Sequence, residues 1–391
     1  MSGIQNNERK KKKVKKMKIR IWNEMDMDSA VEAVANDNVP FREAAKQFDI
    51  PETTLRRRYQ NKYLLPVPPV QPGGFGRFKV TFSAQQGEEL KALLIQMDKL
   101  SQGLTWYDCR RIIYEYADRD GIPHQFSRTK QMASSKWTRT FMQQNAFRLG
   151  RRRLYRPWEA VGCFFEVLGE IRMERSLKPG RIYHVMEMSF SVAASEHVAD
   201  GQCAIATTLS CGCATGHLIP PFMIFPLNCV TSDMIAGAPP GTTAVADASG
   251  SLNLTTFVFF LAQVIEFAKP TKDDPIVLLI GKRSLVSSYW AAKYARDNNI
   301  TLMAFPKCAP CKMKPLSLTF LGVLREYFRQ ALDSFHLTRD QSLVKEKDLA
   351  TLFGYAFTCA ARCNCITPAF ETSGIDPFNP DVASHPGYFS Y

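Results

Sequence analysis

Hydrophobic positions recur at helical spacing through the first third of the chain and give way to short apolar runs in the remainder. Between residues 26 and 63, an apolar stripe around Val31 is followed by a short amphipathic stretch from Phe41 to Phe48. A turn at Asp49 leads into a basic helix that opens at Pro51, a residue favoured in the first helical turn. Two short helices joined by a tight turn, the second of them basic, are typical of a helix-turn-helix unit.

A second group of three helices is predicted further along the chain. Ser83 and Thr105 are favourable N-cap residues, and each is expected to begin a helix. In the third helix Trp137 and Phe141 lie one turn apart and are expected to pack inward, with the basic side chains pointing elsewhere. The basic residues assigned to this third helix are Lys130, Lys136 and Arg139.

From about Trp158 onward the pattern changes to apolar runs typical of buried strands. Strands are predicted at Arg181–Met188, Gln202–Ser210, His217–Phe225, Ile276–Ile280 and Thr301–Phe305. Helices are predicted at Leu254–Ala268, Val286–Asn298 and Asp348–Cys359. Three consecutive strands followed by alternating helices and strands favour a mixed sheet with flanking helices.

Positive charge is concentrated in the first 160 residues, which hold 31 Lys and Arg against 17 Asp and Glu, whereas the rest holds 19 against 20. This imbalance indicates a polyanionic partner for the first part of the chain. The run RKKKKVKKMK at residues 9–18 is too charged to pack, and it is interpreted as a disordered nuclear-localisation segment, the alternative being a tail that only aids solubility. Its basic residues are Arg9, Lys10, Lys11, Lys12, Lys13, Lys15, Lys16 and Lys18.

The stretch LLPVPPVQPGGFGR, which begins at Leu64, contains four prolines and three glycines, so an extended linker is predicted there. The expected organisation is a basic tail at 1–20, a first module at 21–63, the linker at 64–80, a second module at 81–150 and a large domain at 158–391. Neither secretion nor membrane insertion is expected, since the longest apolar stretch, near residues 255–268, is shorter than the roughly 18 residues of a membrane span.

The eleven cysteines are expected to be reduced thiols, because no secretory signal accompanies them. Cys308 and Cys311 form a CxxC pair, but the later cluster has CxxxCxC spacing that matches zinc templates poorly. No zinc site is therefore predicted. The cysteines of that later cluster are Cys359, Cys363 and Cys365.

DNA contacts are expected from the basic helix of each module. In a helix-turn-helix unit the N-terminal part of the second helix faces base edges, and arginines further along reach phosphates or guanine. The candidates in the first module are Glu52, Thr53, Thr54, Arg56, Arg57 and Arg58. The candidates in the second module and its basic exit are Lys130, Lys136, Arg139, Arg151, Arg152 and Arg153. A basic three-helix bundle without sequence preference remains an alternative for the first module, and a helical spacer for the second.

The motif FREAAKQFDIPETTLRRR resembles the Pipsqueak-type helix-turn-helix at the start of pogo/Tigger transposases. The stretch GLTWYDCRRIIYEYADRDGIPHQFSRTKQMASSKWTRTFMQQN resembles the centromere protein B-type domain that follows it in the same family. The segments IYHVMEMSF, CATGHLIPPFMIF, SGSLN, DDPIVLLIGKRS, PLSLTFLGVLREYF and AFETSGIDPFNPDV resemble the DDE superfamily endonuclease domain of pogo/Tigger and jerky-like proteins. Together the resemblances imply a multidomain α plus α/β protein, with two N-terminal helix-turn-helix modules followed by an RNase H-like mixed-sheet domain.

In that endonuclease family three carboxylates hold the two divalent metal ions that activate the attacking oxygen and stabilise the leaving one. Matched onto this sequence, the three positions are Met186, Gly281 and Ser317, and none is acidic. The resemblance therefore implies no catalytic residue, no metal and no enzyme activity. Lys282 and Arg283 follow the second position, where two cations would repel Mg²⁺ and attract a phosphate.

Neighbouring acids do not rebuild the cage. Glu187 is adjacent to Met186, but successive strand residues point to opposite faces. Asp273 and Asp274 lie at the far end of their strand, and Glu326 lies half a turn round the helix predicted after Ser317. Asp247, near a predicted strand end, stays open as a ligand.

These inferences predict a sequence-specific or semi-specific nuclear DNA-binding protein derived from a pogo/Tigger transposase and acting in transcription or chromatin regulation. The expected partners are double-stranded DNA and either a second copy of the chain or a chromatin protein, with no membrane partner and no cofactor. The alternative is an active metal-dependent DNA transposase or endonuclease that uses non-standard ligands. A decaying element copy without a cellular role is the third possibility.

Overall fold

The computed structural model of the protein describes residues 23–36, 39–59, 81–145, 156–193, 203–338 and 344–389. The basic run at 9–18, the linker at 64–80 and the basic exit at 151–153 lie outside the described residues. The chain forms two compact units, Met1–Lys79 and Val80–Tyr391.

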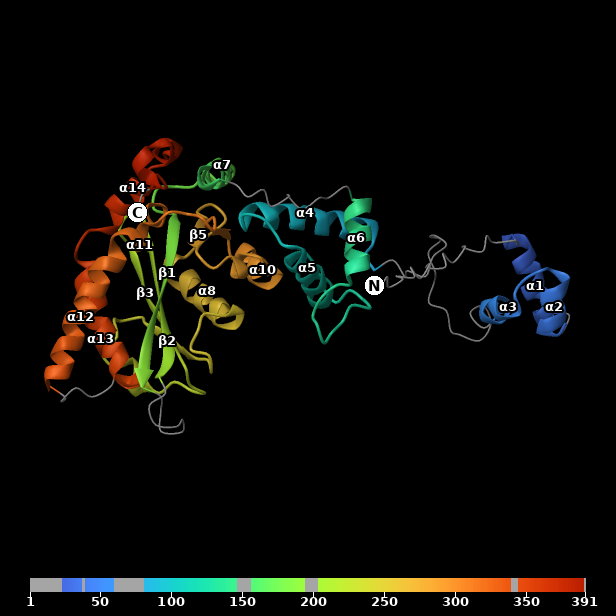
Figure 1. Ribbon diagram of the computed structural model, residues 1–391, viewed down its shortest axis with the longest axis horizontal. Coiled ribbons are helices and arrows are strands. Elements are labelled where there is room, and N and C mark those ends of the chain that lie inside the picture. Colours follow the sequence, from blue (N-terminus) through green and yellow to red (C-terminus); the bar gives the residue numbers. More distant parts are fainter. Residues whose placement is uncertain are drawn as a thin grey trace, which may run out of the picture. The chain divides into compact units, whose positions relative to one another are not determined.

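In the first unit three short helices pack around a small core (blue in Figure 1). The helices are α1 (Glu24–Asn36), α2 (Phe41–Gln47) and α3 (Glu52–Tyr59). Val31, Ala44 and Leu55, one from each helix, are fully buried. The predicted helix-turn-helix arrangement is confirmed.

The second unit begins with three helices, α4 (Ala84–Leu100), α5 (Trp106–Arg119) and α6 (Ser135–Gln144). Capping boxes begin the first two, because Ser83 and Thr105 each accept a hydrogen bond from a backbone N–H three residues later. The prediction that Lys130 belongs to the third helix is wrong. Lys130 lies in a turn closed by a bridge between Ser127 and Met132, and the helix begins only after its N-cap, Ser134.

The rest of the second unit is built on one six-stranded mixed sheet with the order β4-β3-β2-β1-β5-β6 (Figure 1). The strands are β1 (Ile182–Ala193), β2 (Cys203–Cys213), β3 (Leu218–Phe225), β4 (Thr243–Ala246), β5 (Ile276–Ile280) and β6 (Ile300–Ala304). β1, β2 and β3 pair antiparallel, β5 and β6 run parallel to β1, and β4 runs parallel to β3. The expected RNase H-like mixed sheet is confirmed.

Three strands differ from the prediction by more than one residue. β2 continues three residues beyond Ser210, to Cys213. β1 continues five residues beyond Met188, because its pairing with β2 extends to the pair Ala193 and Cys203. β4 was not predicted, since its four half-buried residues give no alternating pattern.

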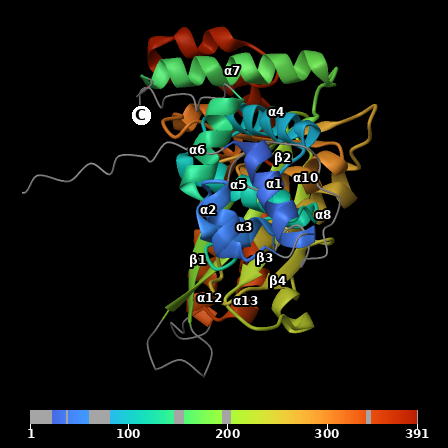
Figure 2. The same cartoon turned by 90° about the vertical axis from the view of Figure 1, so that its right-hand side faces the viewer.

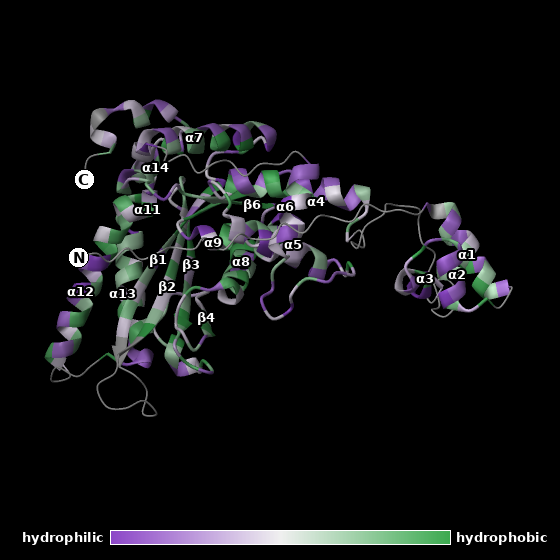
Figure 3. Cartoon of the chain, turned by 45° about the vertical axis from the view of Figure 1, so that its right-hand side comes forward, coloured by the Kyte–Doolittle hydropathy of each residue, from purple (hydrophilic) through white to green (hydrophobic). Residues whose placement is uncertain are grey.

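Helices cover both faces of the sheet. They are α7 (Pro157–Glu174), α8 (Leu254–Ala268), α9 (Arg283–Val286), α10 (Tyr289–Asp297), α11 (Pro315–Leu318), α12 (Phe320–Thr338), α13 (Glu346–Ala361) and α14 (Ile366–Ser373). α7 and α11 to α14 share a core with one face, and α8 to α10 share a core with the other. Hydrophobic residues dominate α8 and the strands, whereas α1 to α3 show hydrophilic outer faces (Figure 3).

Two details bear on the site. The helix predicted at 286–298 is α10, which begins only at Tyr289, and the short helix α9 ends at Val286, before Ser287 and Ser288. At the edge of the domain, α7 lies beside the C-terminal segment (green and red in Figure 2), and Arg172 donates to the carbonyl of Ile375 at 3.4 Å. None of the helices in the described ranges combines the length and hydrophobicity that a bilayer-spanning helix requires.

Candidate nucleic-acid interface

The exposed face of α3 is the candidate DNA-reading surface of the first unit. Leu55 points into the core and is 0% exposed. Thr53 and Arg57 are exposed and lie one turn apart, each about 160° round the helix from Leu55 at 3.6 residues per turn. Arg56 and Arg58 are also exposed, whereas Glu52 and Thr54 are half-buried. Arg57 is therefore the arginine best placed to enter a groove.

Arg56 is held by two neighbours within the first unit. Its guanidinium pairs with Glu52 at 2.8 Å and lies over the Phe41 ring, 4.9 Å from the ring centroid. This pair is exposed on both sides, so it contributes little to stability but fixes the direction of the Arg56 side chain. Glu52 and Arg56, both predicted to contact DNA, are therefore paired with each other in this structure.

The turn before α3 depends on an unusual backbone conformation. Asp49 has a φ of 48°, in the left-handed region that favours glycine. The backbone N–H of Ile50 donates to the carbonyl of Ala45 at 2.9 Å, which closes the end of α2 in a Schellman motif. Ile50 is 4% exposed and anchors the turn in the core, so α3 leaves it in a fixed direction.

In the second unit, α6 presents Lys136 and Arg139 on its exposed side. Phe141 is 6% exposed and stacks on Trp137 with ring centroids 5.2 Å apart, as predicted for the inner face. Lys130 is exposed in the turn before α6. Two of the three predicted basic residues therefore share one helix, and the third lies on a neighbouring loop.

The opposite side of this module is docked on the sheet domain through α5. Glu115 accepts hydrogen bonds from the backbone N–H groups of Tyr289 at 2.8 Å and Trp290 at 3.4 Å. These are the first amides of α10, so Glu115 caps that helix from a distant part of the chain. This contact explains why α10 begins at Tyr289 instead of continuing from α9.

A second group of contacts reinforces the same docking. Asp120 accepts a hydrogen bond from the Tyr289 hydroxyl at 3.0 Å and pairs with Lys293 at 2.6 Å. Arg283 pairs with Asp108 at 3.3 Å and donates to the carbonyl of Gly103. Acidic side chains of α5 are thus matched to basic side chains that follow β5.

The three positions at which the resemblance expects carboxylates converge in the second unit. Val185 pairs with Ile280, so Met186 on β1 and Gly281, directly after β5, lie at the same edge of two neighbouring strands. Ser317 lies on α11, whose Leu316 backbone N–H donates to Nδ1 of His184 at 3.0 Å. The matching of positions by motif therefore agrees with the register of the strands.

None of the three residues at these positions carries a carboxylate. Met186 is 3% exposed and packs in the same apolar cluster as Leu316. A Cβ atom added at Gly281 would meet nothing within 4 Å, so this position is open but carries no ligand. Burial, with a smaller contribution from the Lys314 ammonium, lowers the pKa of His184 to about 3, and the imidazole stays neutral as the acceptor for α11.

Two acidic residues considered as substitute ligands, Glu187 and Asp247, lie away from these three positions. Glu187 follows Met186 on β1 and so points to the opposite face of the sheet. Asp247 follows β4, three strands from β1 and therefore about 14 Å away across the sheet. Hydrogen bonds from Ser249 and from Asn253 (2.7 Å to Nδ2) lower the pKa of the Asp247 carboxyl and occupy its oxygens.

The two cations after Gly281 are engaged within the unit. Lys282 donates to the carbonyl of Leu252, and Arg283 is part of the α5 docking described above. The hypothesis that this pair attracts a phosphate therefore does not fit Arg283. Within the described ranges, no three His, Cys, Asp or Glu side chains gather as a metal site, and this includes the cysteines of both clusters.

Residues 23–65 match the family model described as helix-turn-helix, Psq domain. The match confirms the Pipsqueak-type assignment of the first module and extends two residues into the linker predicted at 64–80. No curated protein matches the chain.

Among solved structures, the chain is similar to complexes of the Mos1 transposase. The Mos1 mariner paired-end complex with Mn is 12% identical, with 95% of this chain and 99% of that chain covered and a TM-score of 0.30. The paired-end complex with left transposon end is 10% identical, with 85% and 97% covered and a TM-score of 0.29. The strand transfer complex is 10% identical, with 88% and 99% covered and a TM-score of 0.28. Identities and TM-scores this low carry no argument about the function of this chain.

Sequence reasoning missed the residues that dock the second module. Asp108 and Glu115 lie two turns apart on α5, and Asp120 is its C-cap residue, which sequence alone interprets as solvated polar positions. The only signal was the pair of serines before Tyr289, which interrupts a predicted helix.

Proposed function

We propose that this chain is a nuclear DNA-binding protein derived from a pogo/Tigger transposase, in which the RNase H-like domain serves as a scaffold without strand-cleaving activity. The observation that carries the proposal is the Psq match at residues 23–65, together with the exposed Thr53 and Arg57 on α3 of that unit. The proposed modules are 21–63 and 81–150, with the degenerate domain at 158–391.

The chemistry of α3 supports reading of bases in a major groove. Arg57 is exposed on the side opposite the core and has no partner among the described residues, so its planar fork is available for guanine. Arg56 is oriented by Glu52. Arg58 lies beside the surface formed by Thr53 and Arg57, and a phosphate contact is expected from it. Lys136 and Arg139 on α6 would add phosphate contacts from the second module.

The proposal is tested by fluorescence anisotropy of the full chain with selected and random duplexes over a range of salt concentrations. Arg57→Gln is expected to weaken binding to the selected duplex by about 5-fold to 100-fold, and to weaken random duplex less. Arg139→Gln is expected to weaken both duplexes equally and to lower the salt slope by about one. Arg325→Gln, at an exposed position on α12, is the matched control and should leave both affinities unchanged.

Two results would refute the DNA-binding proposal. One is the absence of duplex binding at low salt, where phosphate contacts are strongest. The other is an equal loss for Arg57→Gln and Arg325→Gln, which would assign binding to net charge instead of to α3.

The absence of strand cleavage is a separate part of the proposal. It is supported by Met186, Gly281 and Ser317 at the three converging positions, where oxygen ligands for two metal ions would be needed. Calorimetric titration of the full chain with Mn²⁺ should give no isotherm above that of buffer, and no duplex nicking should accompany it. Metal-dependent nicking that disappears in an Asp247→Asn variant would instead support an active enzyme with non-standard ligands.

Nuclear location and a role in transcription or chromatin complete the proposal. They are supported by the basic run at 9–18, which lies outside the described residues, and by the Psq match. Replacing the eight basic residues of that run with Gln should move a fluorescent fusion out of the nucleus. Genome-wide occupancy mapping should then show discrete sites, and an even distribution would argue against a specific target.

A further inference from the structure

A small hollow lies within the second unit, where α4 of the second module meets α10 and β6 of the sheet domain. Its volume is about 40 Å³. Leu93, Met97 and Leu302 contribute to an apolar floor. It exists only because the second module is docked, since its two sides belong to different parts of the chain.

The rim of the hollow is cationic. Arg175, Lys293 and Arg296 line it, and none of the lining residues is acidic. The Lys293 charge is offset by Asp120 at 2.6 Å. Arg175 and Arg296 are exposed, and neither guanidinium has a partner among the described residues.

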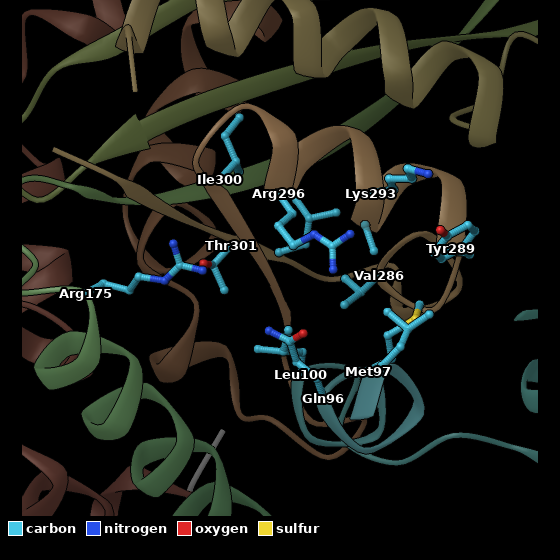
Figure 4. Close-up of a pocket in the computed structure, with 13 residues that line it drawn as sticks. Gln96, Met97, Leu100, Arg175, Val286, Tyr289, Lys293, Arg296, Ile300 and Thr301 are labelled. Atoms are coloured by element: carbon cyan, nitrogen blue, oxygen red, sulfur yellow. The ribbon is translucent and has the colours of Figure 1, made fainter. Parts of the chain in front are cut away.

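Figure 4 shows how these groups lie. The Arg175 side chain extends towards Thr301, and the Arg296 guanidinium lies on the other side of that residue, facing the centre of the hollow. Two like charges at one rim, with no acidic residue in the lining, give a local positive potential. The arrangement favours an anion between the two arginines.

We propose that this hollow binds a phosphate group. Each guanidinium offers a pair of N–H donors in a fixed fork, and Thr301 adds a hydroxyl. A carboxylate has only two oxygens to share between two forks, whereas a tetrahedral oxyanion accepts both forks with separate oxygens. The phosphate is either the free ion or a phosphodiester of bound DNA, whose deoxyribose would rest on the apolar floor.

The test is arginine footprinting of the full chain with phenylglyoxal, which modifies exposed guanidinium groups and is quantified residue by residue by mass spectrometry. Three arms at equal ionic strength contain inorganic phosphate, a random DNA duplex, or sodium chloride alone. Modification of Arg175 and Arg296 should slow together by about five-fold when free phosphate is about four times its dissociation constant. Arg325, exposed on α12, is the internal control in the same sample and should react at an unchanged rate.

Protection of both arginines by inorganic phosphate supports the proposal and assigns the site to free phosphate. Protection by duplex alone assigns the site to a phosphate of the DNA backbone. In that case the double variant Arg175→Gln, Arg296→Gln should also weaken duplex binding more than Arg325→Gln does. Unchanged rates in both arms, or equal slowing of all three arginines, would overturn the proposal. The phosphate arm does not depend on DNA recognition by α3, so the two proposals can fail separately.

Discussion

Removing the Glu115 carboxylate should release the N-terminus of α10. In the native protein one oxygen of Glu115 accepts from the N–H groups of Tyr289 and Trp290 and from the Ser288 hydroxyl. Tyr289 is 3% exposed, so water cannot replace the lost acceptor without local opening. A buried donor left unsatisfied costs about 1–3 kcal/mol, and loss of a helix N-cap typically costs about 1 kcal/mol. We therefore expect Glu115→Ala to destabilise this junction by about 2 kcal/mol.

The assay is hydrogen exchange measured by mass spectrometry on peptides that span α9 and α10. A local cost of about 2 kcal/mol corresponds to exchange about 30-fold faster for the first amides of α10. Glu115→Gln keeps an acceptor and should give a smaller increase. Glu88→Ala removes an exposed carboxylate of α4 and is the matched control. Peptides from β1 report global unfolding and should stay unchanged.

The docking argument would be refuted if exchange at Tyr289 and Trp290 changed by less than two-fold in Glu115→Ala. An equal increase in Glu88→Ala would refute it as well, since the effect would then come from charge alone.

Three further predictions concern other parts of the molecule. Asp49 has a φ of 48°, so Asp49→Gly should stabilise the first unit by about 0.5–1 kcal/mol in thermal unfolding. Glu43→Gly, in α2, should destabilise the first unit by a similar amount. Destabilisation by Asp49→Gly would contradict the turn geometry. The pKa of His184 is lowered to about 3, so the unfolded chain takes up a proton first as pH falls, and stability should decrease by up to about 1.4 kcal/mol per pH unit between pH 6 and 3. Urea titrations should show a shallower decrease for His184→Gln than for the unsubstituted protein, and equal slopes in the two proteins would contradict the assignment. Gly281→Asp should change the free energy of unfolding by less than about 0.5 kcal/mol, because a Cβ atom there meets nothing within 4 Å. Met186→Asp should cost about 3–5 kcal/mol, because Met186 is only 3% exposed. Similar costs for both variants in urea unfolding would contradict the described packing.

Local signals in the sequence predicted the elements that depend on neighbouring residues. The caps at Ser83 and Thr105 and the apolar run at Ile276–Ile280 each specify an element without help from distant parts of the chain. Family motifs placed Met186 and Gly281 at matching positions, and the strand register agrees with that placement.

Contacts between distant residues could not be predicted in the same way. Glu115 is separated from Tyr289 by more than 170 residues, and nothing in either local pattern shows that one caps the other. Arg283 has the charge expected of a phosphate ligand, but its partner Asp108 lies in another module. Lys130 was assigned to a helix on composition, whereas the turn before Ser134 depends on a backbone conformation that composition does not report.

On the proposed descent from an endonuclease with acids at both positions, the different surroundings of Met186 and Gly281 give a returning acid unequal costs. Open space at Gly281 means that an acid could return there with little effect on folding. At Met186 a returning acid would be placed in a close-packed core that the methionine now helps to fill. On that proposed descent, reversion would have to begin at Gly281, directly after β5, and would be opposed at Met186 on β1, where an acid raises the cost of folding.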